Sequence, residues 1–255
     1  MRIRVLGCSG AELPGHRPPS FLLNGKVLFD AGSLTNILSA KDLLKIEHIF
    51  VTHTHLDHIM GIPFLADYLM FSEKRHKVSI IGIPAVIGAI RRNLLDGSIW
   101  PDFTAIPDTH EAILDLRELE PGQSTRIGLY TITPYRVSHS VPACGYLVED
   151  ERERRFFYTG DTGPSDATWE EIGEKQIHCL IIDVSFPNHM EQIAIKTGHL
   201  TPRLLREELL KMKLGPKRIY VIHIKSQYFK LVKKELKELG IESLALLNEG
   251  DVIRL

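Results

Sequence analysis

The sequence predicts an α/β protein in which helices cover the outer faces of β-sheet. Strand-like apolar runs alternate with helix-like segments, and this mixed order occurs twice along the chain. No internal repeat or low-complexity linker interrupts it. A chain of 255 residues can bury a sizeable core as one domain or as two fused halves. The order of elements leaves open whether one sheet or two is present.

The elements of the first half follow from apolar runs and from start and stop residues. Strands are expected where β-branched and apolar residues are punctuated by glycine or asparagine: 2–7, 20–32, 46–53 and 77–83. Leucine and isoleucine at helical spacing predict a helix over 34–46. Helices are also predicted over 58–71, with Pro63 near its start, and over 84–97, between a starting proline and a stopping glycine.

The second half continues in the same way. Strands are predicted over five apolar runs: 125–139, 144–161, 177–186, 217–225 and 243–255. The first two runs and the last read as strand pairs, and the charged EDERERR is then a solvated hairpin tip rather than a nucleic-acid patch. A helix over 201–215 has Thr201 as its cap, Pro202 in its first turn and Gly215 as its stop. An amphipathic helix is predicted over 227–240.

Composition gives no sign of an unusual protein class. Hydrophobic residues make up 44% and charged residues 25%, and the formal charge of −1 gives no overall bias toward nucleic acid or an anionic membrane. Cys8, Cys144 and Cys179 form no CxxC pair or disulfide framework, which suits a reducing compartment. The start has too short an apolar stretch for a signal peptide, and no run reaches the roughly 18 apolar residues of a membrane helix. We therefore expect a cytoplasmic protein.

One short stretch, VTHTHLDHIMG at 51–61, gathers metal-capable side chains at a strand-to-helix junction. His53 and His55 are two apart at the strand end, so both imidazoles leave the same face. Successive side chains in the helix that follows turn by about 100° around its axis, so those of Asp57 and His58 point toward a second location nearby. Burying these groups unpaired would cost several kcal/mol. The stretch therefore predicts two adjacent metal ions rather than packing.

Two metals need further ligands, and strand ends elsewhere in the chain supply candidates. His139, Asp161 and His223 each follow an apolar strand-like run, where a side chain emerges at the edge of a sheet. Each is a weak signal alone, but together with the cluster they provide enough ligands for a dinuclear site. Mixed imidazole and carboxylate ligands suit zinc, with manganese or iron as alternatives.

The HTHLDH motif resembles the HxHxDH signature of the metallo-β-lactamase superfamily, and the three later residues fall in that family's order. The resemblance covers nearly the whole chain. It implies an αβ/βα four-layer sandwich, with two mixed β-sheets flanked by helices, as a single hydrolase domain over 1–255. It also implies that His53, His55 and His139 hold one metal, that Asp57, His58 and His223 hold the other, and that Asp161 bridges both.

A dinuclear site of this kind favours hydrolysis. Two cations roughly 3.5–4 Å apart can supply hydroxide at neutral pH and stabilise charge on a phosphoryl or carbonyl oxygen. Redox chemistry is disfavoured, because the superfamily's diiron members resemble HxExD and His55 stands where their glutamate would be.

Downstream motifs resemble those of the class II cyclic-nucleotide phosphodiesterases. They are LGCSG, PPSFLL, SIWPDF (98–103), DVSFPN (183–188), GHLTP (198–202) and HIK (223–225). One departure is that this class tends to carry a serine-proline pair after the core, where this chain reads MGIPFLADYLM. The resemblance implies hydrolysis of 3′,5′-cyclic nucleotides (cyclic AMP or cyclic GMP) to 5′-nucleotides, and family likeness also implies a homodimer.

His199 and Asp57 are the expected catalytic residues. His199 lies before a helix N-terminus, which favours phosphate, so its imidazole could bind the phosphate or protonate the departing 3′ oxygen. The alternative is a histidine that merely caps or packs. Asp57 is expected both to bind metal and to orient the nucleophile. Cys8 is expected only to line the site, and Lys225 either neutralises phosphate charge or is a surface lysine.

Three rival functions remain open. The first is an RNase Z-like tRNA 3′-processing nuclease, which the segment GCSGAELPGHRPPSFLL also resembles, although the long glycine-rich, basic tRNA-binding arm of that class is missing. The second is hydrolysis of another small cyclic phosphodiester. The third is a non-catalytic scaffold stabilised by metal, which the number of ligands opposes, because structural zinc sites are closed by four ligands.

Overall fold

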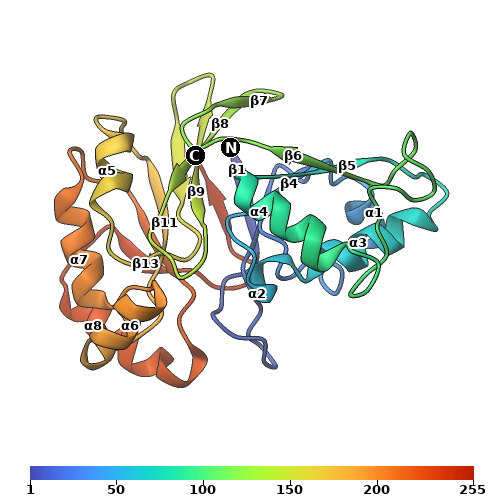
Figure 1. Ribbon diagram of the computed structural model, residues 1–255. Helices are drawn as coiled ribbons and strands as arrows, with labels where there is room; N and C mark the ends of the chain where they lie inside the picture. The colour runs from blue at the N-terminus through green and yellow to red at the C-terminus, as the bar shows by residue number, and fades with distance from the viewer.

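The computed structural model describes residues 1–255 and contains two seven-stranded mixed β-sheets (Figure 1). In spatial order, the first sheet is β14 (Val252–Arg254), β1 (Arg2–Gly7), β2 (Ser20–Leu23), β3 (Val27–Phe29), β4 (His48–Phe50), β5 (Val78–Gly82) and β6 (Leu114–Glu118). The second sheet is β13 (Leu244–Leu246), β12 (Ile219–Ile222), β11 (Cys179–Asp183), β10 (Arg155–Tyr158), β9 (Cys144–Asp150), β8 (Tyr130–Arg136) and β7 (Thr125–Ile127).

The helices form the two outer layers (Figure 1). The N-terminal half supplies α1 (Ala40–Leu43), α2 (Leu56–Ile59), α3 (Gly61–Met70), α4 (Pro84–Ala89) and the π-helix η1 (Ile90–Leu94). The C-terminal half supplies α5 (Asp166–Ile172), the 3₁₀ turn η2 (Asn188–Met190), α6 (Glu191–Thr197), α7 (Pro202–Lys211), the 3₁₀ turn η3 (Ser226–Tyr228) and α8 (Phe229–Glu238). This is the four-layer α/β arrangement that the family resemblance implies, whereas the order of elements alone left one sheet or two open. None of these helices has the length and apolar character that crossing a membrane requires.

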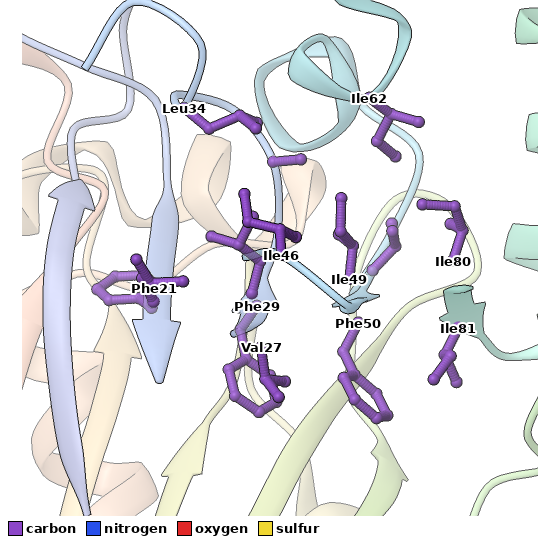
Figure 2. Close-up of a cluster of buried hydrophobic side chains, with 14 of the residues drawn as sticks. Phe21, Val27, Phe29, Leu34, Ile46, Ile49, Phe50, Ile62, Ile80 and Ile81 are labelled. Carbon is purple, nitrogen blue, oxygen red and sulfur yellow. The ribbon is translucent and has the colours of Figure 1, made fainter. Parts of the chain in front are cut away.

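An aromatic layer fills the space between the two sheets. Phe21 contacts Tyr158 with ring centroids 4.8 Å apart, and Phe50 contacts Tyr146 at 5.3 Å. Figure 2 shows Phe50 and Ile49 on opposite faces of β4, which is the alternation expected of a strand buried on both sides. The sheets are therefore held face to face by large side chains, and their edges are fixed relative to each other.

The parallel strands of each sheet end at the edge where the site forms. β3, β4, β5 and β6 are parallel in the first sheet, and β10, β11, β12 and β13 are parallel in the second. Polar residues directly follow several of these carboxyl ends, as is common for ligand sites in α/β proteins. Loops from both sheets therefore meet at one edge of the sandwich.

Several predicted elements differ from the structure. The run 243–255 does form two strands, but they do not pair: β13 joins β12, and β14 joins β1 in the other sheet. The helix predicted over 34–46 is limited to α1, whose cap is Ser39. The helix predicted over 201–215 has the Thr201 cap but ends at Lys211, before Gly215.

Other boundaries also shift. The helix predicted over 84–97 divides into α4 and the π-helix η1, and the helix predicted over 58–71 is preceded by α2 as a separate turn. The strand β6 and the helices α5 and α6 were not predicted.

Candidate metal centre

All seven predicted metal ligands lie together at the edge between the two sheets. Four of them come from the segment between β4 and the end of α2: His53, His55, Asp57 and His58. The other three each follow a strand of the second sheet, namely His139 after β8, Asp161 after β10 and His223 after β12. Both halves of the chain therefore contribute to one site.

The ligand atoms form two groups that share Asp161. One group is His53, His55, His139 and Asp161, and the other is Asp57, His58, Asp161 and His223; within each group the ligand atoms lie within 4.8 Å of one another. The arrangement agrees with the two locations predicted from the HTHLDH motif.

Short distances define the first group. His55 Nδ1 lies 3.1 Å from His53 Nε2 and 3.2 Å from His139 Nε2. His53 Nε2 is 3.7 Å from Asp161 Oδ2. Burial lowers the pKa of His53 well below its ordinary value and also lowers the pKa of His139. Neutral imidazoles therefore present ring-nitrogen lone pairs to a common point, which is the form that binds metal.

The second group is richer in negative charge. Asp161 Oδ1 is 3.4 Å from His58 Nε2, and Asp161 Oδ2 is 3.3 Å from His223 Nε2. His223 Nε2 also lies 3.3 Å from Asp57 Oδ2. Burial alone would raise the pKa of Asp161, but the neighbouring His223 and His58 outweigh it and hold that pKa well below the ordinary value. Asp161 is therefore a buried carboxylate surrounded by imidazoles.

Two orphaned atoms test whether this donor set fits metal ions. His58 Nε2 and Asp161 Oδ1 are fully buried and have no hydrogen-bond partner. An unsatisfied buried polar atom is costly, so native proteins pair nearly all of them. Both atoms face the interior of the second group, and a divalent cation there would satisfy both at once. The residues present therefore fit a metal ion.

Asp30, which the sequence did not single out, holds two of the candidate ligands in place. This buried carboxylate accepts hydrogen bonds from His58 Nδ1 at 2.7 Å and from Tyr158 Oη at 2.6 Å. It also accepts from the backbone N–H and the hydroxyl of Thr52, each at 2.8 Å. The Thr52 oxygen lies 3.0 Å from His53 Nδ1 and can accept its proton. Asp30 thereby orients Nε2 of both histidines toward the site.

Replacing Asp30 with asparagine is expected to weaken metal binding about 10–100-fold, the usual cost of losing a partner of a metal-ligating histidine. The amide group of asparagine cannot accept all four hydrogen bonds, so His58 loses its fixed orientation. Competition with a chromophoric chelator measures the Zn²⁺ affinity. Asp150→Asn, at a buried aspartate that pairs with Arg154, is the control. Equal Zn²⁺ affinity in the two variants would mean that Asp30 serves folding only.

Two glycines allow backbone to approach the candidate ligands. Gly198 has a φ of 71°, and a Cβ there would lie 2.7 Å from His139 Cα; its carbonyl accepts from His139 Nδ1 at 2.8 Å. A Cβ on Gly10 would lie 2.4 Å from the carbonyl oxygen of His223. The glycines of the LGCSG and GHLTP motifs therefore have local steric causes.

His199 lies between α6 and α7, next to the second group, as expected from the sequence. Its Nδ1 donates to Asp183 Oδ2 at 2.8 Å, and its ring stacks on that of His223 with centroids 5.4 Å apart. Burial lowers the pKa of His199, but the Asp183 carboxylate outweighs this and the pKa is raised above its ordinary value. His199 and Asp183 therefore form a dyad able to hold a proton at Nε2 beside the second group of candidate ligands.

Three residues of the DVSFPN motif make specific contacts in this loop. Asp183 pairs with His199, and the Phe186 ring packs 5.7 Å from the same imidazole. Asn188 Oδ1 accepts from the backbone N–H of Arg203 at the start of α7, which ties the loop to that helix. The sequence marked the motif by resemblance but gave no separate role to Asp183 or to Ser185, which lies between these residues.

Residues 26–224 match the family described as "Beta-lactamase superfamily domain", and the chain belongs to that family. With its two mixed sheets and its His/Asp clusters, it is of the metal-dependent hydrolase class. A Yersinia pestis protein named "Probable 3',5'-cyclic-nucleotide phosphodiesterase" is 28% identical over 238 residues, covering 81% of this chain and 67% of that protein. A protein named "Ribonuclease Z" from Haloferax volcanii is 26% identical over 284 residues, covering 89% and 86%.

Solved structures show the same fold. Unliganded yeast PDE1 superposes with a TM-score of 0.86 at 18% identity, covering 100% of this chain and 99% of that chain. The short form of human tRNase Z gives a TM-score of 0.73 at 20% identity, covering 100% and 99%. The metallo-β-lactamase architecture predicted from the HTHLDH resemblance is thus confirmed.

Proposed function

We propose that the chain, a metal-dependent hydrolase acting on phosphoester bonds, opens 3′,5′-cyclic nucleotides to 5′-monophosphates. The observation that carries this proposal is the placement of the Asp183–His199 dyad directly beside two ligand groups that share Asp161. Such a site offers cation binding for a phosphate and a proton donor for a leaving oxygen within one small space. The relative from Yersinia pestis supports cyclic nucleotides as the substrate class.

The residues would hold two divalent cations, for which we propose zinc. His53, His55 and His139 would hold one ion, Asp57, His58 and His223 the other, and Asp161 would contact both. Imidazole with carboxylate is a ligand set that zinc commonly takes in catalytic sites. Bound there, the two ions would lower the pKa of a shared water molecule and neutralise charge on phosphoryl oxygens.

The protein's own side chains would then guide the proton and the substrate. The Asp57 side chain is 32% exposed, so one face of this carboxylate can accept a hydrogen bond from the attacking water and orient it. The attack forms a new phosphorus–oxygen bond and breaks the bond to the 3′ oxygen of the ribose. His199 Nε2 would give its proton to that departing oxygen, while Asp183 holds the imidazole in position.

The longest loop of the fold lacks the basic side chains expected of a tRNA-binding arm. The longest segment without regular structure, 95–113, contains no lysine or arginine. A protein that grips RNA needs basic side chains to neutralise phosphates. Arg17, in the segment 8–19, is paired with Glu249. Neither segment therefore forms the basic arm expected of a tRNA-processing enzyme, whereas the short loop 71–77 carries Lys74, Arg75 and Lys77.

Ribonuclease Z activity is the second candidate, and the relatives favour it as strongly. The Haloferax volcanii protein covers more of this chain than the Yersinia pestis protein does, 89% against 81%. The two candidates share the metal centre and differ in the substrate. Binding of tRNA that weakens steeply as salt is added would support this candidate, because phosphate contacts release counterions.

Hydrolysis of both classes of substrate by the same Zn²⁺- or Mn²⁺-loaded preparation decides between them. We expect 5′-nucleotide release from cyclic AMP or cyclic GMP and little cleavage of a precursor tRNA. Chelation of the metal should abolish the activity, and readdition of Zn²⁺ should restore it. Cleavage of precursor tRNA without release of 5′-nucleotide would replace the proposed function with the second candidate.

We also propose a cytoplasmic location and a single domain, each on one observation. Cys8, Cys144 and Cys179 are all free and buried, which supports the expected cytoplasmic location. The candidate ligands come from both halves of the chain, which supports one hydrolase domain over 1–255.

A further inference from the structure

Ser185 is a buried residue whose hydroxyl lies between the proton-donating dyad and a candidate metal ligand. Its side chain is fully buried in the loop after β11. Its Oγ lies 2.7 Å from Asp183 Oδ1 and 2.9 Å from His223 Nδ1. The same oxygen is 3.2 Å from His199 Nδ1 and 3.0 Å from the carbonyl oxygen of His223. No other hydroxyl is in contact with both histidines.

The number of available protons fixes how this network is connected. A serine hydroxyl has one proton to donate, and an ionised carboxylate can only accept. The shortest contact assigns that proton to Asp183 Oδ1. The Ser185 oxygen is then free to accept the Nδ1 proton of His223, while the Nδ1 proton of His199 goes to Asp183 Oδ2 at 2.8 Å. In this arrangement both Nδ1 protons have an acceptor and both oxygens of the Asp183 carboxylate have a donor.

The consequence is that both histidines have a defined tautomer. With Nδ1 of His223 donating, its Nε2 keeps a lone pair directed toward Asp57 and Asp161, each 3.3 Å away. With Nδ1 of His199 donating, its Nε2 is the atom that can carry a second proton. One hydroxyl therefore connects the residue that would bind metal to the carboxylate that orients the acid.

We propose that Ser185 is a positioning residue for the second metal ion, acting through His223, and that it connects this ion to the Asp183–His199 dyad. The inference rests on the proposed function for the dyad, but its metal-binding part is independent of the substrate. Removal of the hydroxyl leaves the Nδ1 proton of buried His223 without its acceptor. Partners of this kind fix the orientation of a ligating histidine.

Zn²⁺ titration of the metal-free full chain, followed calorimetrically, tests the proposal. Wild type is expected to show two binding events. Ser185→Ala should weaken one of them about 10–100-fold, the usual effect of removing such a partner, and leave the other unchanged. The first group, with His53, His55 and His139, thus serves as an internal reference. Ser185→Gly removes the same hydroxyl without adding a metal-binding group, should give the same loss, and carries the test if Ser185→Ala does not fold.

Ser79→Ala provides the matched control, because Ser79 is a buried serine in β5 of the other sheet. It should bind both Zn²⁺ ions as wild type does, and its thermal unfolding midpoint reports the cost of deleting a buried hydroxyl. Two unchanged binding events in folded Ser185→Ala or Ser185→Gly would overturn this inference and leave the proposed function intact. Failure of wild type itself to take up Zn²⁺ would overturn both.

Discussion

Replacing Asp161 with asparagine is expected to remove tight binding of both metal ions and to reduce phosphodiester hydrolysis to the background rate. Asp161 is the one side chain that belongs to both ligand groups, and it is only 1% exposed. Asparagine has nearly the same shape but carries no negative charge. The first group would then have no anion to balance a bound cation and the second would keep only Asp57, so both locations lose affinity.

Elemental analysis of the dialysed variant, with hydrolysis of cyclic AMP assayed in parallel, measures this effect. His53→Ala should also lose metal and activity, because His53 is buried within the first group. Asp150→Asn makes the same chemical change at a buried aspartate of β9 and should retain both ions and activity. An Asp161→Asn protein that still holds two ions would contradict the shared role of this carboxylate.

Replacing His199 with alanine should separate the two effects: the variant keeps full metal content but shows a large loss of turnover. General acid catalysis contributes typically about 10²–10⁴-fold, and kcat for cyclic AMP is expected to fall within that range. His199 is not in either of the two groups that contain Asp161, so those ligands remain in place. Asp183 keeps its contact with Ser185 in this variant, which helps to preserve the loop.

The leaving group distinguishes proton donation by His199 from a structural role. The ribose 3′ oxygen needs a proton as it departs, whereas p-nitrophenolate leaves without one. His199→Ala should therefore be far less impaired toward bis(p-nitrophenyl) phosphate than toward cyclic AMP. His189→Ala changes an exposed histidine in η2 and should leave both rates unchanged. Equal losses on the two substrates would refute proton donation, and full activity on cyclic AMP would leave His199 without the assigned role.

The candidate ligands could be predicted because their signals are local. The spacing within HTHLDH indicates that one segment directs its side chains toward two neighbouring metal positions. His139, Asp161 and His223 each follow an apolar strand, and carboxyl ends of parallel strands meet at one edge. These residues come together because of the order of the strands in the two sheets. That order was expected from the family resemblance and not from the spacing of the residues. Their roles as metal ligands stay predictions until metal is measured.

The residues that support the ligands could not be predicted, because their partners are distant in the sequence. Asp30 reads as a single acidic residue after a strand, and only packing of the two sheets brings Tyr158 to it. Ser185 reads as an ordinary polar residue after β11, and its role depends on His223, which follows the next strand, β12. Hydrogen bonds of this kind leave no periodic pattern in the sequence.

The errors in the fold have a similar origin. The run 243–255 has the pattern of two strands around a turn, but hydrophobic pattern does not specify a strand's partner. The backbone of Leu247 donates to Val221 in one sheet, and that of Gly250 donates to Val5 in the other, so this turn crosses between sheets. The predicted helix over 34–46 fails at its start, where Leu34 and Leu38 are buried in a turn before the Ser39 cap.

The content of tightly bound metal in the wild-type protein tests the central claim most directly. The protein is equilibrated with Zn²⁺ and dialysed free of excess metal, and its zinc content per chain is then measured by inductively coupled plasma mass spectrometry. Two Zn²⁺ ions per chain is the result expected from two ligand groups that share one carboxylate. A content of one ion or none would contradict the dinuclear site.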